Sequence, residues 1–197
     1  MRFIDPSGKE VYVKSNGYID NGIAVKDIND PRFYLVMDGK QTLLGELGGK
    51  IDANFIYTNL LNQNIKHAHG ISNPFTLYSL VKTGGEWDLK NNENTVFGIA
   101  NAKTRQFGKT FFEFEGMLME PQDIGNHHFG VVGKATGLFS EWILQSLAGI
   151  YQIISGTSKE QWQNGVKTLT IFPYGDDPQD QIWMMFGFEY YDKGGNK

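Results

Sequence analysis

The spacing of hydrophobic positions changes several times along the chain. Residues 11–13 alternate as in a strand, and residues 33–44, with Asp38 and Gly39 at their centre, predict a β-hairpin. We therefore expect an antiparallel, β-rich lead-in over residues 1–50.

Helical spacing follows. One helix is predicted from Asp52, as its cap, to about Gly70, and a second from Asn73 to Gly84. The period then returns to two, which predicts two or three strands over residues 95–119 with a turn at Glu115.

The rest of the chain is expected to be mainly helical. It contains a glycine-rich helix at 126–136, an apolar helix at 140–155, a short helix after Ser158 with Gln161 completing a capping box, a strand at 166–172 and a last helix from Asp177 to 191. The predicted fold class is α+β: the lead-in, then a mainly helical domain over residues 51–197, interrupted by a β-hairpin region.

Composition and charge exclude several kinds of site and of ligand. The chain has no cysteine, which excludes disulfides and thiolate metal sites. Its 18 Lys and Arg against 22 Asp and Glu give a net charge of −4, so no general basic field attracts a phosphate backbone. The first residues do not resemble a signal peptide and no apolar stretch is long enough for membrane insertion.

Three polar clusters beside glycines are candidates for chemistry. The first, at residues 84–90, places Glu86, Asp88 and Lys90 around Trp87, and so offers an acid or base, a cation and a stacking face. The alternative is a helix end with solvated charges, in which Trp87 anchors the core.

The second cluster contains Asp123, Asn126, His127 and His128. Neighbouring histidines on a helix diverge by about 100°, so a general acid or base role for one ring is favoured over a metal site formed by both. Asp123 equally suits a helix cap.

The third cluster holds Tyr174, Asp176, Asp177, Asp180 and Gln181. Close carboxylates bind a divalent cation such as Mg²⁺ or share a proton. Asp177 and Asp180 also suit the start of a helix, whereas capping does not require Asp176.

Isolated glycines do not form a phosphate-binding motif here, because neither a P-loop nor a dinucleotide fingerprint is present. Gly133, Gly137 and Gly149 are instead expected to permit close packing of helices.

In this order the three clusters resemble the polymorphic toxin type 44 domains, which end RHS-type and other secreted bacterial effectors. The family pattern GG-x-WD-x-K matches residues 84–90, D-x-GN with an aromatic-glycine pair matches 123–130, and YGDDP-x-DQ matches 174–181. The resemblance covers about residues 70–192, and Glu86 lies at a variable position. Residues 2–8 are similar to the stretch that closes an RHS repeat cage.

The resemblance implies a secreted antibacterial domain that a secretion system delivers into a target cell and a cognate immunity protein neutralises. It also implies a nuclease acting on RNA. The catalytic candidates are Asp88, Lys90, Asp123, Asn126, His127, His128 and Asp176, of which Asp88, Lys90, Asn126 and Asp176 should line one cleft. Substrate binding is assigned to Glu86, Trp87, Tyr174, Asp177, Asp180 and Gln181.

The predicted function is a ribonuclease, with a peptidoglycan hydrolase as the alternative and a non-catalytic module as the second alternative. A ribonuclease would depend on a metal held by Asp176 and Asp180, or on local cations: Lys90, Lys103, Arg105, Lys109 and Lys134. A muramidase-like peptidoglycan hydrolase needs two carboxylates and an aromatic platform, and it tolerates an acidic surface. A non-catalytic module would use the same motifs for packing and for recognition of the immunity protein.

Overall fold

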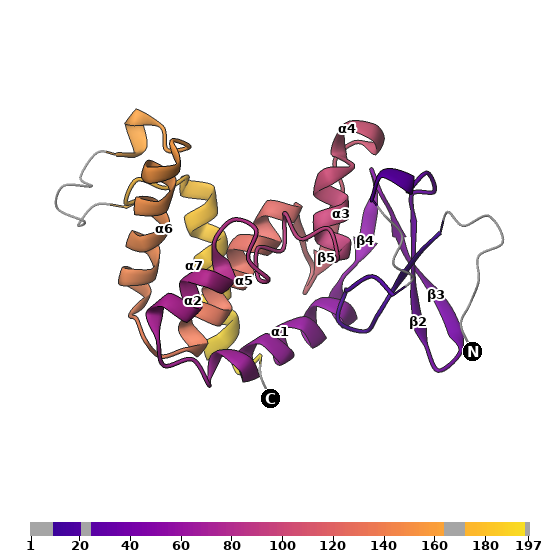
Figure 1. Cartoon of the computed structure of the whole chain (residues 1–197), viewed down its shortest axis with the longest axis horizontal. Helices are drawn as coiled ribbons and strands as arrows, with labels where there is room; N and C mark the ends of the chain where they lie inside the picture. The colour runs from indigo at the N-terminus through magenta and orange to yellow at the C-terminus, as the bar shows by residue number, and fades with distance from the viewer. Residues whose placement is uncertain (1–9, 21–24, 164–171, 196–197) are drawn as a thin grey trace. The chain divides into compact units, whose positions relative to one another are not determined.

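The computed structural model describes residues 10–20, 25–163 and 172–195, which form two compact units (Figure 1). Unit 1 comprises residues 1–63 and 80–125, and unit 2 comprises residues 64–79 and 126–197. The helices and the β-sheet of the structure together confirm the predicted α+β class. The helices are α1 (Asn54–Ala68), α2 (Pro74–Val81), α3 (Val96–Ala102), α4 (Thr104–Phe107), α5 (Pro121–Ala135), α6 (Glu141–Ser155) and α7 (Pro178–Asp192), with 3₁₀ turns at Val25–Asp27 and Glu160–Trp162.

Unit 1 is built on one six-stranded sheet with the order β1-β2-β3-β4-β5-β6. The expected hairpin is confirmed, since Asp38 and Gly39 have positive φ angles and join two antiparallel strands. The lead-in is not wholly antiparallel as predicted, because β1 pairs with β2 in parallel. The strands are β1 (Val11–Val13), β2 (Arg32–Met37), β3 (Lys40–Glu46), β4 (Lys50–Asp52), β5 (Phe111–Phe114) and β6 (Met117–Met119).

The sheet joins the lead-in to the later hairpin. Ile51 of β4 pairs with Phe112 of β5, and both side chains are fully buried. The expected boundary at residue 50 falls at the start of β4, and the assignment of residues 1–50 to a delivery scaffold stays a prediction.

Aromatic rings fill the core of unit 1. Tyr57 packs edge-to-face on Phe97 and Phe114, with ring centroids 5.5 and 4.8 Å apart. Its hydroxyl donates to the carbonyl of Ile124 at 3.1 Å, so the one polar atom of this buried ring is satisfied.

The prediction of strands from residue 95 was wrong for the first half of that segment. The Thr95 hydroxyl accepts a hydrogen bond from the Gly98 N–H at 3.1 Å and caps α3. Strands are confined to β5 and β6, which are joined at Glu115 as expected. Two contacts favour a helix over an extended chain. One is this cap, and the other is the close packing of Gly98, where a Cβ would lie 2.1 Å from the Asn92 carbonyl oxygen.

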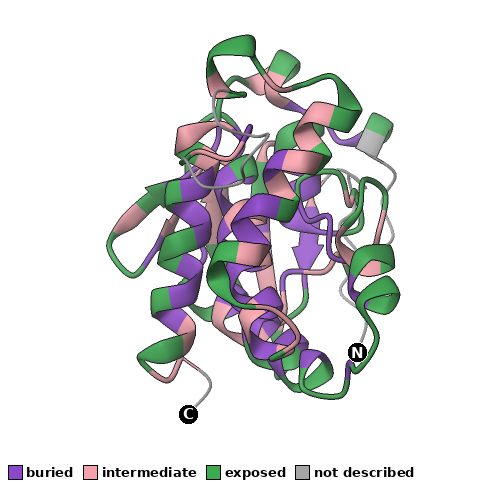
Figure 2. Ribbon diagram, turned by 90° about the vertical axis from the view of Figure 1, so that its left-hand side faces the viewer, coloured by how far each residue is buried: buried purple, intermediate pink, exposed green. Residues whose placement is uncertain are grey.

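Unit 2 depends on glycines where its helices approach. A Cβ on Gly130 of α5 would lie 2.2 Å from the Met184 carbonyl oxygen, and one on Gly187 of α7 would lie 2.2 Å from that of His127. Residues of α5 are buried or half-buried except for Gln122, whereas buried and exposed residues are interspersed along α7; Figure 2 colours the ribbon by burial. The two backbones are therefore in direct contact.

The helix-packing role predicted for Gly133 is confirmed, whereas Gly149 of α6 permits the close approach of the turn before α7 and not of another helix. A Cβ on Gly133 would lie 3.0 Å from the Leu144 side chain, and one on Gly149 would lie 2.0 Å from the Tyr174 carbonyl oxygen. Gly137 was predicted wrongly: a Cβ there would meet nothing within 4 Å, and its φ of 65° instead suits the end of α5.

Helix ends follow local rules with two exceptions. Asp177 caps α7 as predicted. The helix α5 begins at Pro121, earlier than expected, and Asp123 accepts from the Glu120 N–H at 2.8 Å. The capping box predicted at Ser158 is wrong, because the short helix is a 3₁₀ turn whose N-cap residue is Lys159, without a side-chain cap; the Ser158 hydroxyl donates to the carbonyl of Gly175. The expected strand at 166–172 lies outside the described residues except for Phe172, which is in a turn.

Substitution of Gly130 by alanine should strongly destabilise unit 2. The new methyl group would overlap the backbone of α7, and overpacking of this kind costs about 1–3 kcal/mol. Gly125→Ala is the matched control, because its Cβ on the same helix would meet nothing closer than 4.0 Å. Urea unfolding followed by circular dichroism measures both variants, and equal midpoints would contradict this account of the crossing.

Candidate functional site

A polar loop after α2 forms a site in unit 1. Trp87 anchors the loop: the residue is 3% exposed, and its backbone N–H donates to the Leu80 carbonyl at 2.9 Å. The carboxylate of Asp88 accepts from the Gly84 N–H at 2.9 Å and from the side-chain amide of Asn91 at 2.8 Å. Asp88 therefore ties together the two ends of the turn.

Asn92 holds the second half of the loop. Its side-chain amide donates to the Glu86 carbonyl at 2.9 Å, and its side-chain oxygen accepts from the backbone and side-chain N–H groups of Asn94 at 3.1 and 3.2 Å. These bonds leave the carboxylate of Glu86 free to face a ligand.

This loop and Tyr18 line an open pocket of about 470 Å³, formed by Tyr18, residues 84–86 and residues 91–94. None of these lining residues is Lys, Arg or His. Across the described ranges, neither Glu86 nor Glu93 has a hydrogen-bond or ion-pair partner for its carboxylate. Burial, with the charge of Glu86 as a second cause, raises the pKa of Tyr18 above its usual value, so its phenol is neutral at pH 7.

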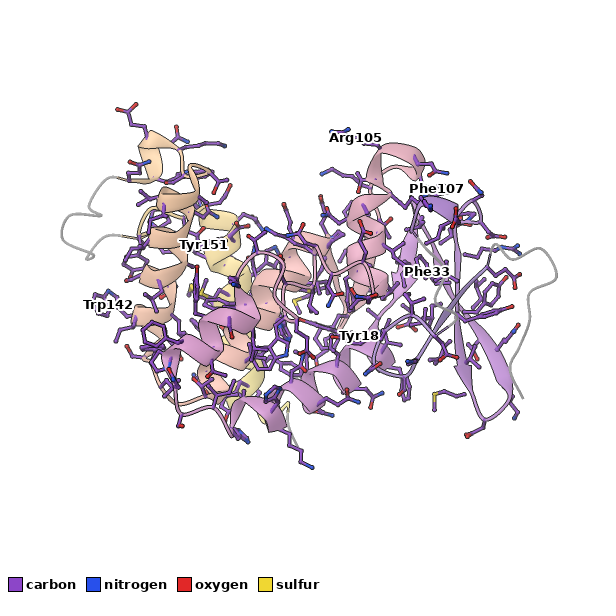
Figure 3. All side chains as sticks on the ribbon, in the orientation of Figure 1. Tyr18, Phe33, Arg105, Phe107, Trp142 and Tyr151 are labelled. Carbon is purple, nitrogen blue, oxygen red and sulfur yellow. The ribbon has the colours of Figure 1, made fainter. Side chains whose placement is uncertain are left out.

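Most of the cations suggested for RNA binding are already engaged. Lys103 is buried and donates to the Ile28 carbonyl, Lys109 pairs with Glu120 at 2.7 Å, and Lys134 pairs with two carboxylates. Lys90 is exposed beside the loop, and Arg105 projects from α4 into solvent (Figure 3). The arrangement leaves little positive charge for a phosphate backbone.

The histidine pair lies in the interior of unit 2. His127 is 1% and His128 0% exposed, and the Nε2 atom of His128 lies 2.9 Å from the side-chain nitrogen of Asn64. Burial lowers the pKa of each ring to about 3, so both are neutral at pH 7. Their general acid or base role stays a prediction.

Asp176 is also buried in unit 2, at 2% exposure. Its carboxylate accepts from the Gln181 side chain at 2.5 Å and from the Asp177 N–H at 3.0 Å. Burial, and then the charge of Asp180, raises the pKa of Asp176 to about 7. Asp180 itself accepts from the Gln152 side chain at 2.9 Å.

The predicted site residues are thus divided between two units. Asp88, Lys90 and Asp123 belong to unit 1, whereas Asn126 and Asp176 belong to unit 2. Their common cleft stays a prediction. So does the Mg²⁺ ion, and within the described residues no group of three His, Asp or Glu side chains is arranged to hold a metal.

Sequence analysis missed part of the pocket lining. The Asn-rich run at residues 91–94 directly follows the first motif, and its carboxamides were a readable signal of a polar loop. Tyr18 lies far upstream in the sequence and reaches the pocket through long-range pairing that no local pattern reveals.

The buried groups of unit 2 predict how its stability depends on pH. Between about pH 4 and 6 the two histidines bind up to two protons fewer in the folded chain than in the unfolded chain, whereas Asp176 binds up to one more. The net effect is a loss of stability on acidification. Asp176→Asn should steepen this loss by about 1.4 kcal/mol per pH unit between pH 6 and 5.

The measurement is the free energy of unfolding of the full chain in urea at each pH, with hydrogen exchange on α5 and α7 reporting on unit 2. The wild-type chain is the reference, because both chains share all other titrating groups. A shallower pH dependence in Asp176→Asn would reverse the assigned sign.

Comparison with known proteins identifies the family. The family model described as bacterial toxin 44 matches residues 76–193, which is more than half of the chain. No curated protein and no solved structure matches. Within the described ranges, no helix is both long and apolar enough to cross a membrane. The match spans all three polar clusters, and the chain belongs to the bacterial toxin 44 family.

Proposed function

We propose that this toxin hydrolyses the glycan strands of peptidoglycan in the pocket of unit 1. The proposal rests on the polar side-chain atoms of the pocket that make no hydrogen bond within the described residues. These atoms are acceptors: the carboxylates of Glu86 and Glu93 and the side-chain oxygens of Asn91 and Asn94. Such a surface favours a ligand rich in hydrogen-bond donors.

A glycan supplies those donors through its hydroxyl groups and through the N–H of each N-acetyl group. A phosphodiester carries acceptors and a negative charge, so both carboxylates would repel it. The pocket volume of about 470 Å³ lies within the range of small-ligand sites. The net charge of −4 agrees with a substrate that is not a polyanionic nucleic acid.

Glycoside hydrolysis requires two carboxyl groups with different tasks. We assign these two tasks to Glu86 and Glu93, the two carboxyl groups among the residues that line the pocket. Asp88 is assigned a positioning role, since its carboxylate is occupied by Gly84 and Asn91.

The ribonuclease alternative keeps one favourable feature, the exposed Lys90 next to the loop. It would have to stabilise phosphoryl charge with few unpaired cations, since Lys103, Lys109 and Lys134 are engaged elsewhere.

We also propose that the domain is secreted by its producer and that its immunity protein acts by covering the pocket.

Directing the chain to two compartments separates the hydrolases. Expression with an export signal should lyse the host and release soluble peptidoglycan fragments, because the proposed substrate lies outside the cytoplasm. Expression without the signal should leave RNA intact. Cytoplasmic killing with degraded RNA would instead establish the ribonuclease, and binding to purified cell walls without release of fragments would leave a binding module.

Replacement of either carboxylate tests the assigned chemistry. Glu86→Gln and Glu93→Gln should each lower fragment release from purified peptidoglycan by about 10²–10⁴-fold, the usual contribution of general acid–base catalysis. Glu115→Gln is the matched control, since Glu115 is an exposed glutamate of unit 1 outside the pocket. Thermal midpoints should stay close to wild type, and undiminished release would rule out these carboxylates.

Asp88→Asn should behave differently, because it weakens the bonds that close the loop. We expect a lower thermal midpoint together with reduced activity, as the Gly84 N–H and the Asn91 amide lose a charged acceptor. An inactive Asp88→Asn chain with a wild-type midpoint and wild-type binding of glycan fragments would place Asp88 among the reacting groups.

A further inference from the structure

We infer that Tyr18 is the aromatic platform on which a sugar ring of the substrate stacks, although Tyr18 lies outside the matched residues 76–193. The inference rests on the proposed function for its substrate, an N-acetylated glycan. It adds a specificity-determining residue that no toxin motif in the sequence contains.

The position of Tyr18 is fixed by main-chain bonds on both sides. The Ile19 N–H donates to the Asn94 carbonyl at 2.8 Å, and the Val96 N–H donates to the Gly17 carbonyl at 2.9 Å. Tyr18 itself forms an antiparallel bridge with Thr95. The segment around Tyr18 is therefore attached to the end of the pocket loop as firmly as a short strand pair.

The surroundings of Gly17 strengthen this attachment. Its φ of 78° favours glycine, and a Cβ there would lie 3.4 Å from the Phe97 ring of the unit 1 core. The turn before Tyr18 is thus seated on the core, which gives the tyrosine a defined orientation at the pocket wall.

Tyr18 has the chemistry that a sugar platform requires. The apolar C–H face of a sugar packs on an aromatic ring, while its hydroxyl groups need acceptors around the rim. Tyr18 is the aromatic residue among those that line the pocket, and Glu86, Glu93 and Asn94 supply acceptors. The Asn92 side chain lies beside its hydroxyl and lowers the pKa of Tyr18, although burial and the charge of Glu86 outweigh this effect.

Trp87, to which sequence analysis gave the stacking role, is 3% exposed and anchors the loop from within. Tyr18 is half-buried and lines the pocket, so a ligand can contact its ring, whereas Trp87 is buried and does not line the pocket. The aromatic part of the site thus comes from a segment some seventy residues before the loop that carries the carboxylates.

The test compares the full chain with Tyr18→Ala, Tyr18→Phe and, as control, Tyr151→Ala, which removes an exposed tyrosine from α6 (Figure 3). Calorimetric titration with a soluble N-acetylglucosamine oligomer measures binding, and release of fragments from soluble peptidoglycan gives kcat and KM. We expect Tyr18→Ala to weaken binding and raise KM about tenfold with a smaller change in kcat. Tyr151→Ala should stay within about threefold of wild type, and Tyr18→Phe, which keeps the ring, should recover most of the affinity that Tyr18→Ala loses.

A measurement on the wild-type chain covers the case in which Tyr18→Ala does not fold. Saturation-transfer NMR should show magnetisation passing between the oligomer and the Tyr18 ring protons. Wild-type binding and KM in a folded Tyr18→Ala chain, or no transfer to the ring, would overturn the inference while the hydrolase proposal stands. Binding through Tyr18 without cleavage would overturn the hydrolase and retain the platform, and a wild-type chain that neither binds nor cleaves glycan would overturn both.

Discussion

The carboxylate of Asp88 is the constraint on which the geometry of the pocket depends. A buried carboxylate is stable only when donors replace its water, and here the Gly84 N–H and the Asn91 side chain provide them. Hydrogen bonds to a charged group contribute about 1.5–3 kcal/mol each, so these two bonds oppose opening of the loop. The aspartate of the first family motif therefore has a structural explanation that is independent of any role in bond cleavage.

Close backbone contact has the corresponding role in unit 2. Because Gly130 and Gly187 let α5 and α7 touch, the side chains around the crossing are sealed from water, and His127 and His128 are kept neutral there. The same exclusion of water favours the protonated form of Asp176, whose neighbour Asp180 adds a like charge. Residues that are catalytic candidates in the sequence thus make the stability of this unit depend on pH.

Local rules predicted much of the fold and only part of the site. The Asp38-Gly39 hairpin and the Asp177 cap depend on neighbouring residues, so the sequence alone was sufficient for them. The segment after Thr95 was misread because its apolar residues suit either period, although the contacts that decide for a helix, the Thr95 cap and the packing of Gly98 on Asn92, are local in the sequence. The parallel pairing of β1 with β2 and the position of Tyr18 at the pocket both depend on residues far apart in the sequence, so no local pattern predicts them.

Net charge by itself is a weak guide to the substrate, because a small excess of acidic residues permits a local basic site. The decisive quantity is the charge that remains after ion pairs and buried bonds are taken into account. In the described part of unit 1, Lys103 and Lys109 are committed to protein acceptors, whereas the carboxylates of Glu86 and Glu93 remain open to a ligand. Within the pocket lining, Glu86 and Glu93 are not offset by any Lys, Arg or His, so the pocket is locally more acidic than the net charge of the chain suggests, and a polyanion meets a larger electrostatic penalty there than the proposed glycan.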